Sequence, residues 1–206
     1  MKLYSLEDGR TFVRSARTII KNYLIKKDIF YPEELLKYEE KVGVFTTLKK
    51  YSNNSLRGCI GFPKPIYPLY KALALSAIHA AVDDPRFEPL SLEELDNIII
   101  EINILTEPRL IVVNNPEEYL EKIKIGEDGL LLEYKIYSGL LLPEVAVEEE
   151  WDVKTFLDYL CIKAGLYKDC WKTLPVKIYK FQSQIFAEKE PNGEIIEIKL
   201  KNNSYI

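Results

Sequence analysis

The sequence predicts an α+β fold built on a largely antiparallel sheet with flanking helices. Segments of strand character follow one another through short turns, whereas a parallel sheet would need long helical crossovers. Helical spacing is sustained in three segments, 6–27, 68–82 and 152–164. With 206 residues, 47% of them hydrophobic and 29% charged, the chain can bury one sizeable core, or a core with a satellite.

The first half of the chain predicts a helix, a β-hairpin and a second helix. Ser5 and Asp8 have the spacing of a capping box, and apolar residues recur at helical spacing behind them. A turn sequence at 52–55 separates two β-rich runs, and Pro68 suits the first turn of a helix. The expected elements are a helix over 6–27, a short helix or turn over 32–39, strands over 42–51 and 56–62, and a helix over 68–82.

The second half predicts more strands and shorter helices. Ser91 with Glu94 caps a short helix, Asp152 is a good N-cap, and Asn192-Gly193 is a strong hairpin signal. We interpret residues 1–206 as a single domain, in which a boundary near 107–116 would separate two lobes. The expected elements are strands over 97–106, 129–137, 176–188 and 194–200, with helices over 116–123 and 152–164.

The cysteines and the hydropathy pattern exclude several classes of protein. Cys59, Cys161 and Cys170 are an odd number without CxxC spacing, which argues against a disulfide framework or a zinc site. Cys161 falls on the core stripe of the helix over 152–164, and Cys170 is expected to be semi-buried. No apolar run is long enough to span a membrane, and no secretory signal is visible. We therefore expect a reduced, cytoplasmic protein without a cofactor.

Charge is distributed unevenly along the chain. Residues 1–80 hold 14 basic and 7 acidic side chains, a net of +7, and residues 81–206 hold 14 and 25, a net of −11. The basic residues are scattered, so a solvated surface is favoured over a nucleic-acid face. The chain also has 22 Lys and 23 Glu with one Met and two Gln, a pattern of heat-adapted proteins and equally of an AT-rich genome.

The segment 56–62, Leu-Arg-Gly-Cys-Ile-Gly-Phe, is the least ordinary in the sequence. On a strand, Arg57, Cys59 and Gly61 would share one face, with Arg57 and Cys59 about 6–7 Å apart at their α-carbons. A neighbouring guanidinium favours a thiolate, and Gly58 and Gly61 would let a ligand or another backbone approach closely. Three interpretations stay open: a buried structural cysteine, a nucleophile, or a ligand-facing strand without covalent chemistry.

Other polar residues are candidates around this strand. The single histidine, His79, is the only imidazole available as a base, and the loop after it holds Asp83, Asp84 and Arg86. These side chains could hold a polar substrate or an Mg²⁺ ion. More often, such a loop satisfies its own backbone and forms surface ion pairs. Glu101 interrupts an Ile-rich strand, and we predict that it pairs with Arg57 or Arg86. No Walker A, GxGxxG, HExxH or GxSxG pattern is present.

At 56–61, Leu-Arg-Gly-Cys-Ile-Gly, the sequence resembles the AMMECR family, named after the human Alport syndrome and elliptocytosis region protein. The resemblance extends from about residue 8 to 188. It implies an α+β fold with a larger and a smaller lobe and a cleft between them, lined in part by the hexapeptide. It supports Arg57, Cys59, Asp84 and Arg86 more than His79 or Glu101. Further matching segments are Val44–Leu48, Asp84–Phe87, Gly139–Ala146, Trp151-Asp152 and Lys163–Leu166.

The family's biochemical activity is not established, and its suggested roles include transcription, translation and repair. Archaeal and bacterial relatives are associated with a Memo-type protein and a radical enzyme, which the resemblance implies as partners. We weigh two functions. The first is an enzyme, or a component of one, that acts on a small polar or nucleotide-like substrate. Its candidate catalytic residues are Cys59 and Arg57, and its candidate ligand-binding residues are Gly58, Gly61, Asp84, Arg86 and Glu101. The second is a noncatalytic module that presents the same strand to a protein or a nucleic acid, with nucleic acid disfavoured by a pI near 5.3.

Overall fold

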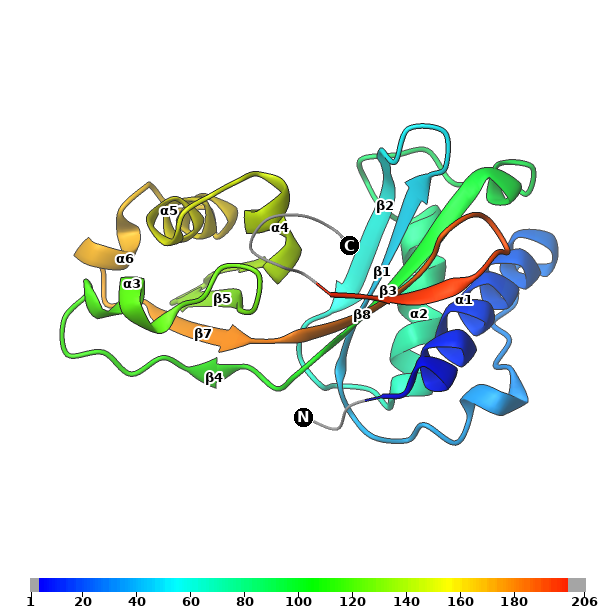
Figure 1. Cartoon of the computed structure of the whole chain (residues 1–206), viewed down its shortest axis with the longest axis horizontal. Helices are drawn as coiled ribbons and strands as arrows, with labels where there is room; N and C mark the ends of the chain where they lie inside the picture. Colours follow the sequence, from blue (N-terminus) through cyan, green and yellow to red (C-terminus); the bar gives the residue numbers. More distant parts are fainter. Residues whose placement is uncertain (1–3, 200–206) are drawn as a thin grey trace. The chain divides into compact units, whose positions relative to one another are not determined.

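The computed structural model describes residues 4–199, which form two compact units (Figure 1). Unit 1 contains residues 4–105 and 184–198, and unit 2 contains residues 106–183 and 199. Each unit has its own antiparallel sheet and its own hydrophobic core. The predicted α+β class with largely antiparallel sheets is therefore confirmed, and the cleft between two lobes stays a prediction.

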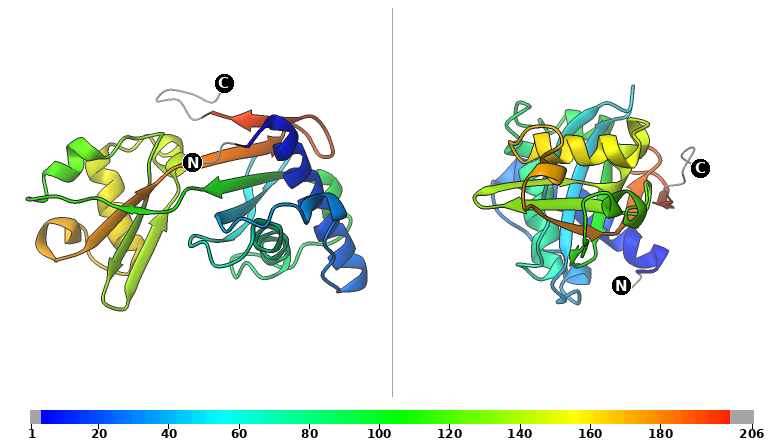
Figure 2. Two further views of the ribbon diagram at one scale, coloured as in Figure 1. Left: turned by 90° about the horizontal axis from the view of Figure 1, so that it is seen from below. Right: turned by 90° about the vertical axis from the view of Figure 1, so that its left-hand side faces the viewer.

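Unit 1 is a five-stranded sheet of order β2-β1-β3-β8-β9, with α1 and α2 on one face (Figures 1 and 2). Helix α2 packs against β1 and β2, and α1 packs against β3, β9 and α2. The elements are α1 (Leu6–Lys26), η1 (Glu33–Leu35), β1 (Gly43–Lys50), β2 (Leu56–Phe62), α2 (Leu69–Val82), η2 (Glu94–Asn97), β3 (Ile98–Leu105), β8 (Ser183–Glu188) and β9 (Ile195–Ile198).

The ends of α1 are fixed by local hydrogen bonds. The Ser5 Oγ accepts from the Asp8 N–H at 3.1 Å, and the Asp8 carboxylate accepts from the Ser5 N–H at 2.9 Å. This is the capping box that the sequence predicts, and it satisfies two backbone donors that a helix start leaves without partners. The helix ends where Lys27 takes a left-handed conformation, with φ of 58°.

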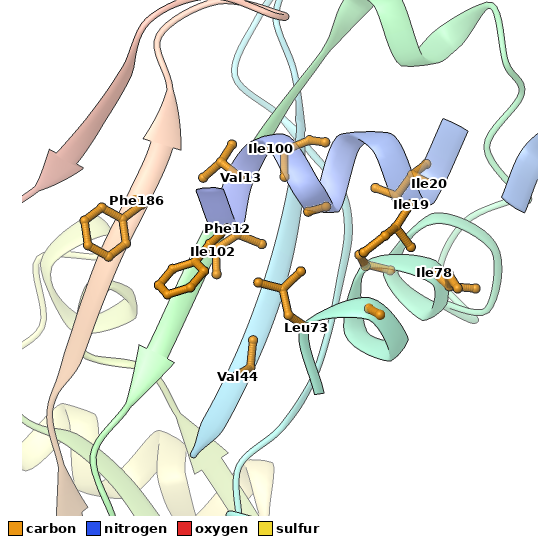
Figure 3. Packing of buried hydrophobic residues seen from close by; sticks show 14 of the residues in the cluster. Phe12, Val13, Ile19, Ile20, Val44, Leu73, Ile78, Ile100, Ile102 and Phe186 are labelled. Carbon is orange, nitrogen blue, oxygen red and sulfur yellow. The ribbon is translucent and has the colours of Figure 1, made fainter. Parts of the chain in front are cut away.

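The core of unit 1 lies between the two helices and one face of the sheet (Figure 3). Phe12, Leu73, Ile100 and Ile102 are fully buried there, and they come from α1, α2 and β3. The alternation of isoleucines along β3 places one set of side chains on this face, as expected for a strand with a buried side.

A buried ion pair ties α1 to the middle of the sheet. The Arg17 Nε donates to the Glu188 Oε1 at 2.7 Å, and the Glu188 Oε2 accepts from the Ile100 N–H at 3.0 Å. Arg17 also donates to the carbonyls of Leu95 and Ile98. Because each charged group has several partners, the pair avoids the large penalty of an unsatisfied buried charge.

Unit 2 is a four-stranded sheet of order β4-β7-β5-β6, covered by α5, whose neighbour is α6. Its core includes Leu132, Phe156, Leu160, Trp171 and Ile178. Its elements are β4 (Arg109–Leu110), α3 (Glu118–Lys122), β5 (Gly129–Tyr134), β6 (Tyr137–Leu141), α4 (Pro143–Glu148), α5 (Val153–Lys163), α6 (Cys170–Thr173) and β7 (Lys177–Phe181). Among the residues described in either unit, no helix is both long and apolar enough to cross a membrane.

Two strands differ from the prediction. The single strand expected over 176–188 is two strands, because the chain passes from unit 2 to unit 1 there and β7 and β8 join different sheets. The strand expected over 129–137 ends at Tyr134, where Lys135 has a positive φ of 53° and the chain turns into β6. The hairpin expected at Asn192-Gly193 is confirmed, since β9 pairs with β8.

The expectation that all cysteines are reduced is wrong for Cys161 and Cys170. They form a disulfide with a Cα–Cα distance of 5.8 Å, and both residues are fully buried. The chain reverses between them through Gly165 and Asp169, both with positive φ, so that α6 begins beside α5. The odd cysteine count hid this pair, because the third residue, Cys59, forms no disulfide and lies in the other unit.

Loss of this disulfide should destabilise unit 2. The Cys161→Ala/Cys170→Ala variant is expected to lose about 3 kcal/mol of unfolding free energy, as estimated for a closed loop of about ten residues. Denaturant unfolding followed by tryptophan fluorescence measures the loss, since Trp151 and Trp171 both belong to unit 2. A reductant should lower the wild type to the level of the variant and leave the variant unchanged. A wild type that is insensitive to reductant would contradict the prediction.

Candidate functional site

Strand β2, which carries the hexapeptide, is the end strand of the unit 1 sheet among the described residues and pairs with β1. Gly58 and Ile60 lie opposite Leu48 and Thr46, on the face that packs against α2. Cys59 lies opposite Thr47, and Gly61 lies opposite Phe45, on the other face. The prediction that Cys59 and Gly61 lie on one face of the sheet, and Gly58 and Ile60 on the other, is therefore confirmed.

The alternation does not continue to Arg57, because the strand has a bulge there. Lys49 pairs with Leu56 while Leu48 pairs with Gly58, which leaves Arg57 as the extra residue. The buried Arg57 guanidinium donates to both carboxylate oxygens of Glu94, each at 3.1 Å. It also lies over the Phe87 ring, 5.8 Å from its centroid. Arg57 therefore does not follow the regular alternation from which its place on the face of Cys59 was predicted.

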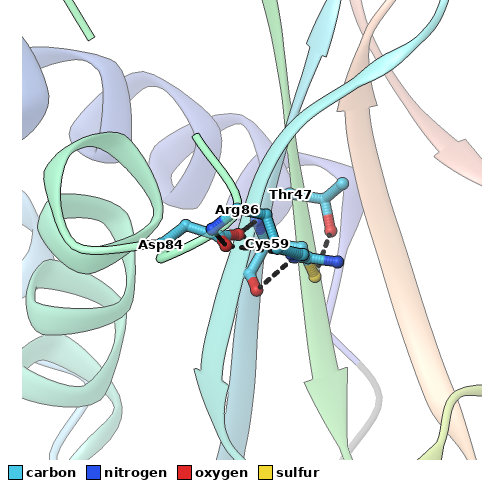
Figure 4. A network of polar contacts seen from close by, with 4 residues as sticks. All are labelled: Thr47, Cys59, Asp84 and Arg86. Atoms are coloured by element: carbon cyan, nitrogen blue, oxygen red, sulfur yellow. Dashed lines mark hydrogen bonds and ion pairs between the residues drawn. The ribbon is translucent and has the colours of Figure 1, made fainter. Parts of the chain in front are cut away.

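The Cys59 peptide is held from outside the sheet by Asp84 and Arg86 (Figure 4). The Cys59 N–H donates to the Asp84 Oδ2 at 2.8 Å, and the Arg86 Nη2 donates to the Cys59 carbonyl oxygen at 3.3 Å. The two side chains also pair with each other, with Arg86 Nε 2.9 Å from Asp84 Oδ1 and Nη2 2.7 Å from Oδ2. Together they satisfy the backbone groups that an edge strand would otherwise leave open.

The pairing changes the protonation of both groups. The Arg86 guanidinium, together with the N–H groups of Cys59 and Arg86, lowers the pKa of Asp84 from 3.8 to about 2 and outweighs the effect of burial. The pKa of Arg86 is raised, first by its hydrogen bond to Asp84 and then by the charges of Asp84 and Cys59. Asp84 is therefore a carboxylate and Arg86 a cation throughout the physiological range.

The Cys59 side chain contacts a hydroxyl that the sequence analysis did not single out. The Thr47 Oγ1 donates to the Cys59 Sγ at 3.3 Å. Because the N–H and C=O of Cys59 point outward, it forms a non-hydrogen-bonded pair with Thr47, the type that brings side chains closest. Thr47 also lies opposite Glu101 of β3, so Cys59, Thr47 and Glu101 form a polar row across three strands.

The predicted pairing of Glu101 with Arg57 or Arg86 is wrong. Glu101 is buried, and its carboxylate lies 3.2 Å from the Lys49 Nζ, while Arg57 and Arg86 pair with Glu94 and Asp84. Lys49 is two residues from Thr47 on β1 and shares its face, so a cation from the neighbouring strand reaches the carboxylate. A role of Glu101 in ligand binding stays a prediction.

Both glycines of the hexapeptide have a packing reason. A Cβ on Gly58 would lie 2.1 Å from the carbonyl oxygen of Ala80, so its absence lets α2 approach the strand. A Cβ on Gly61 would lie 2.4 Å from the ring of Phe45, which covers the glycine from the neighbouring strand. The close approach of another backbone, one of the two predicted reasons for these glycines, applies at both, since a Cβ on Gly61 would also lie 2.3 Å from the carbonyl oxygen of Val44. Ligand binding at either glycine stays a prediction.

His79 lies near the C-terminal end of α2 and pairs with Asp83, at 2.6 Å between Nδ1 and Oδ2. Its ring packs edge-on near Phe62, on the same unit but away from the polar row. In the described part of the chain, no group of three or more His, Cys, Asp or Glu residues could hold a metal ion. The side chains gathered around Cys59 are its own thiol, the Thr47 hydroxyl and two ion pairs, Asp84–Arg86 and Lys49–Glu101.

Comparison with known proteins identifies the family. The profile of the AMMECR1 family matches residues 13–186, which include β2 and the loop of Asp84 and Arg86. The chain belongs to the AMMECR1 family. A protein of Methanocaldococcus jannaschii is 56% identical over 203 residues, covering 97% of this chain and all of the relative. A protein of Pyrococcus abyssi is 51% identical over 194 residues, covering 92% of this chain and 94% of the relative.

A solved structure is also similar. The crystal structure of an uncharacterized protein from Pyrococcus horikoshii has a TM-score of 0.90 and 49% identity, covering 94% of this chain and 98% of that one. These AMMECR1 relatives come from thermophilic archaea, in agreement with the composition rich in Lys and Glu. Intracellular proteins of hyperthermophilic archaea can retain disulfides, so the disulfide of unit 2 does not contradict the cytoplasmic location expected from the sequence.

Substitution of Gly58 should be costly even though it adds only a methyl group. Gly58→Ala is expected to lower the unfolding free energy by roughly 1–3 kcal/mol, because the methyl group would meet a backbone oxygen that cannot rotate away. Thermal and denaturant unfolding measure the change. Ser55→Ala, at an exposed position just before the same strand, is the control and should be nearly neutral. Equal stabilities of the two variants would contradict the packing role.

The Asp84–Arg86 pair predicts an acid-dependent loss of stability. Since the folded pKa of Asp84 is below 3.8, its contribution is complete above about pH 4 and is lost as the pH falls toward 2. We expect the wild type to lose roughly 2 kcal/mol over this range relative to Asp84→Asn. Asp83→Asn, which changes the adjacent exposed carboxylate, should keep the wild-type profile. Parallel acid profiles of wild type and Asp84→Asn would contradict the prediction.

Proposed function

We propose that this chain is an enzyme, or the catalytic component of one, whose reacting group is the Cys59 thiol. The observation that carries the proposal is the way in which the cysteine is held. Its backbone is bonded on both sides by one Asp–Arg pair, and its sulfur accepts a hydrogen bond from Thr47. Groups fixed in this way on strands of a sheet are well suited to chemistry, because they need little reorganisation when a substrate binds.

The neighbours of the thiol favour its reactive form. A hydroxyl that donates to sulfur stabilises a thiolate over a thiol, and so does a nearby guanidinium. Arg86 provides that cation, since its guanidinium reaches the Cys59 carbonyl and responds to the charge of Cys59. Arg57, the activating group predicted from the sequence, stays a candidate at a second position, paired with Glu94.

We propose a small polar or nucleotide-like substrate, and group transfer or hydrolysis as the reaction. The polar row of Cys59, Thr47 and Glu101 offers a nucleophile, a hydroxyl donor and a carboxylate on one face of the sheet. The proposed binding site also includes four residues near this row, namely Gly58, Gly61, Asp84 and Arg86. We also propose a cytoplasmic location, as expected from the sequence. Association with a Memo-type protein and a radical enzyme is proposed from the family resemblance.

Alkylation of the native protein by iodoacetamide tests the role of Cys59. We expect Cys59 to be labelled without unfolding and the rate to reach half its maximum below pH ~8.5, the midpoint of an ordinary cysteine. Thr47→Val should move this midpoint upward by about one pH unit, because the donor to sulfur is lost. Mass spectrometry assigns the labelled residue, and Cys59→Ser should abolish native labelling.

The adjacent threonine provides a matched control. The Thr46 hydroxyl lies 2.7 Å from the Ser76 hydroxyl in the core, on the opposite face of β1. Thr46→Val should therefore leave unchanged the pH at which the alkylation rate of Cys59 is half its maximum, even if the substitution alters stability. Labelling of Cys59 only after unfolding would overturn the enzymatic proposal and favour the noncatalytic module that presents the same strand.

A further inference from the structure

Arg86 presents a positive charge outward beside Cys59, while its counter-ion is turned inward. The Asp84 side chain is only 2% exposed, but that of Arg86 is 50% exposed. Asp84 accepts four hydrogen bonds, from the Cys59 N–H and from the N–H, Nε and Nη2 of Arg86. Its lone pairs are occupied inside the protein, so Arg86 is the member of the pair that solvent and ligands can reach.

One nitrogen of the guanidinium is left for a further contact. Nε and Nη2 are bound to Asp84, and Nη2 also reaches the Cys59 carbonyl. Within residues 4–199, the Arg86 Nη1 has no hydrogen-bond partner. A guanidinium has five N–H donors in a fixed plane, and those that the protein leaves open suit the oxygens of a carboxylate or a phosphate.

The position of this donor is fixed before any ligand arrives. The Arg86 side chain is held at its Nε and Nη2 by Asp84 and lies over the Phe87 ring, 5.5 Å from the centroid. Arg57 lies over the same ring at 5.8 Å but is buried and paired with Glu94, whereas the Arg86 side chain is half exposed. Arg86 therefore loses little side-chain entropy on binding, in contrast to a mobile surface arginine.

We propose that Arg86 is a specificity-determining residue that receives an oxyanion of the substrate, a carboxylate or a phosphate, next to the Cys59 thiol. This inference rests on the proposed function and adds to it the charge class of the substrate. The substrate bears its oxyanion within reach of the Arg86 Nη1, and its reacting atom lies at the Cys59 sulfur. Neutral and cationic analogues of the same size bind this site less well.

The rates of alkylation by iodoacetate and iodoacetamide test the proposal, since the two reagents differ by a carboxylate against an amide. In each case the thiolate displaces iodide and forms a thioether. We take the rate with iodoacetate divided by the rate with iodoacetamide, and divide this ratio for the folded wild type by the same ratio for the unfolded chain. The resulting normalised ratio should be well above one. Arg86→Gln should reduce this normalised ratio by roughly threefold to tenfold, the effect of one partly screened charge. Arg86→Lys should restore part of it.

Two controls separate charge from structure. Arg14→Gln removes one exposed positive charge from α1, on the other side of the sheet, and should keep the wild-type ratio. If Arg86→Gln merely loosens the strand, both rates rise together and the ratio is unchanged, which would overturn the proposal. Protection by sodium acetate and by inorganic phosphate, measured in parallel, distinguishes a carboxylate site from a phosphate site.

The outcomes also separate this inference from the proposed function. A folded wild type that reacts with neither reagent would contradict both. A Cys59 that reacts readily with both, at a normalised ratio near one in wild type and Arg86→Gln alike, would leave the thiol chemistry standing and overturn the anion site. A raised ratio that Arg86→Gln lowers and Arg14→Gln does not would support the oxyanion assignment.

Discussion

Strand β2 is an edge strand, and its exposed backbone at Cys59 imposes the constraint on which the site depends. An open N–H and C=O at a sheet edge would invite another strand, so they need partners from the same chain. Asp84 and Arg86 provide them from the loop after α2. Because the two side chains also pair with each other, the loop, the strand and the ion pair depend on one another. The two hydrogen bonds to the Cys59 peptide thus explain why Asp84 and Arg86 lie two residues apart in the loop after α2.

The same arrangement determines what faces the sulfur. Since the Cys59 peptide points outward, its side chain stands close to that of Thr47 on β1, and the register of β1 with β3 adds Glu101 beyond it. Each member of the row is placed by backbone hydrogen bonds of a sheet whose other face is packed by α1 and α2. Side chains placed by a packed sheet keep their geometry better than side chains carried on loops.

Local patterns predicted most of unit 1, and long-range features were missed. The capping box of Ser5 and Asp8 and the turn at 52–55 gave α1 and the β1–β2 hairpin, because caps and turns depend on neighbouring residues. The bulge at Arg57 was not predicted, and the side chain proposed to activate Cys59 pairs with Glu94 there. The pairing of Cys161 with Cys170, the Lys49–Glu101 contact and the division of 176–188 between two sheets all depend on tertiary structure. Thr47 could have been found from the alternation of β1, once its register with β2 was known.

The hexapeptide can be divided by asking what each residue does for the fold. Gly58 admits α2, Gly61 admits the ring of Phe45, and Arg57 fills a bulge and pairs with Glu94. Cys59 differs, because the bonds from Asp84 and Arg86 reach its backbone and would hold any residue at that position. A β-branched residue such as valine would also suit a half-buried strand position, so the strand itself does not single out sulfur there. Under the proposed function, the thiol serves chemistry rather than packing, and the outward charge of Arg86 would select the kind of molecule on which that chemistry acts.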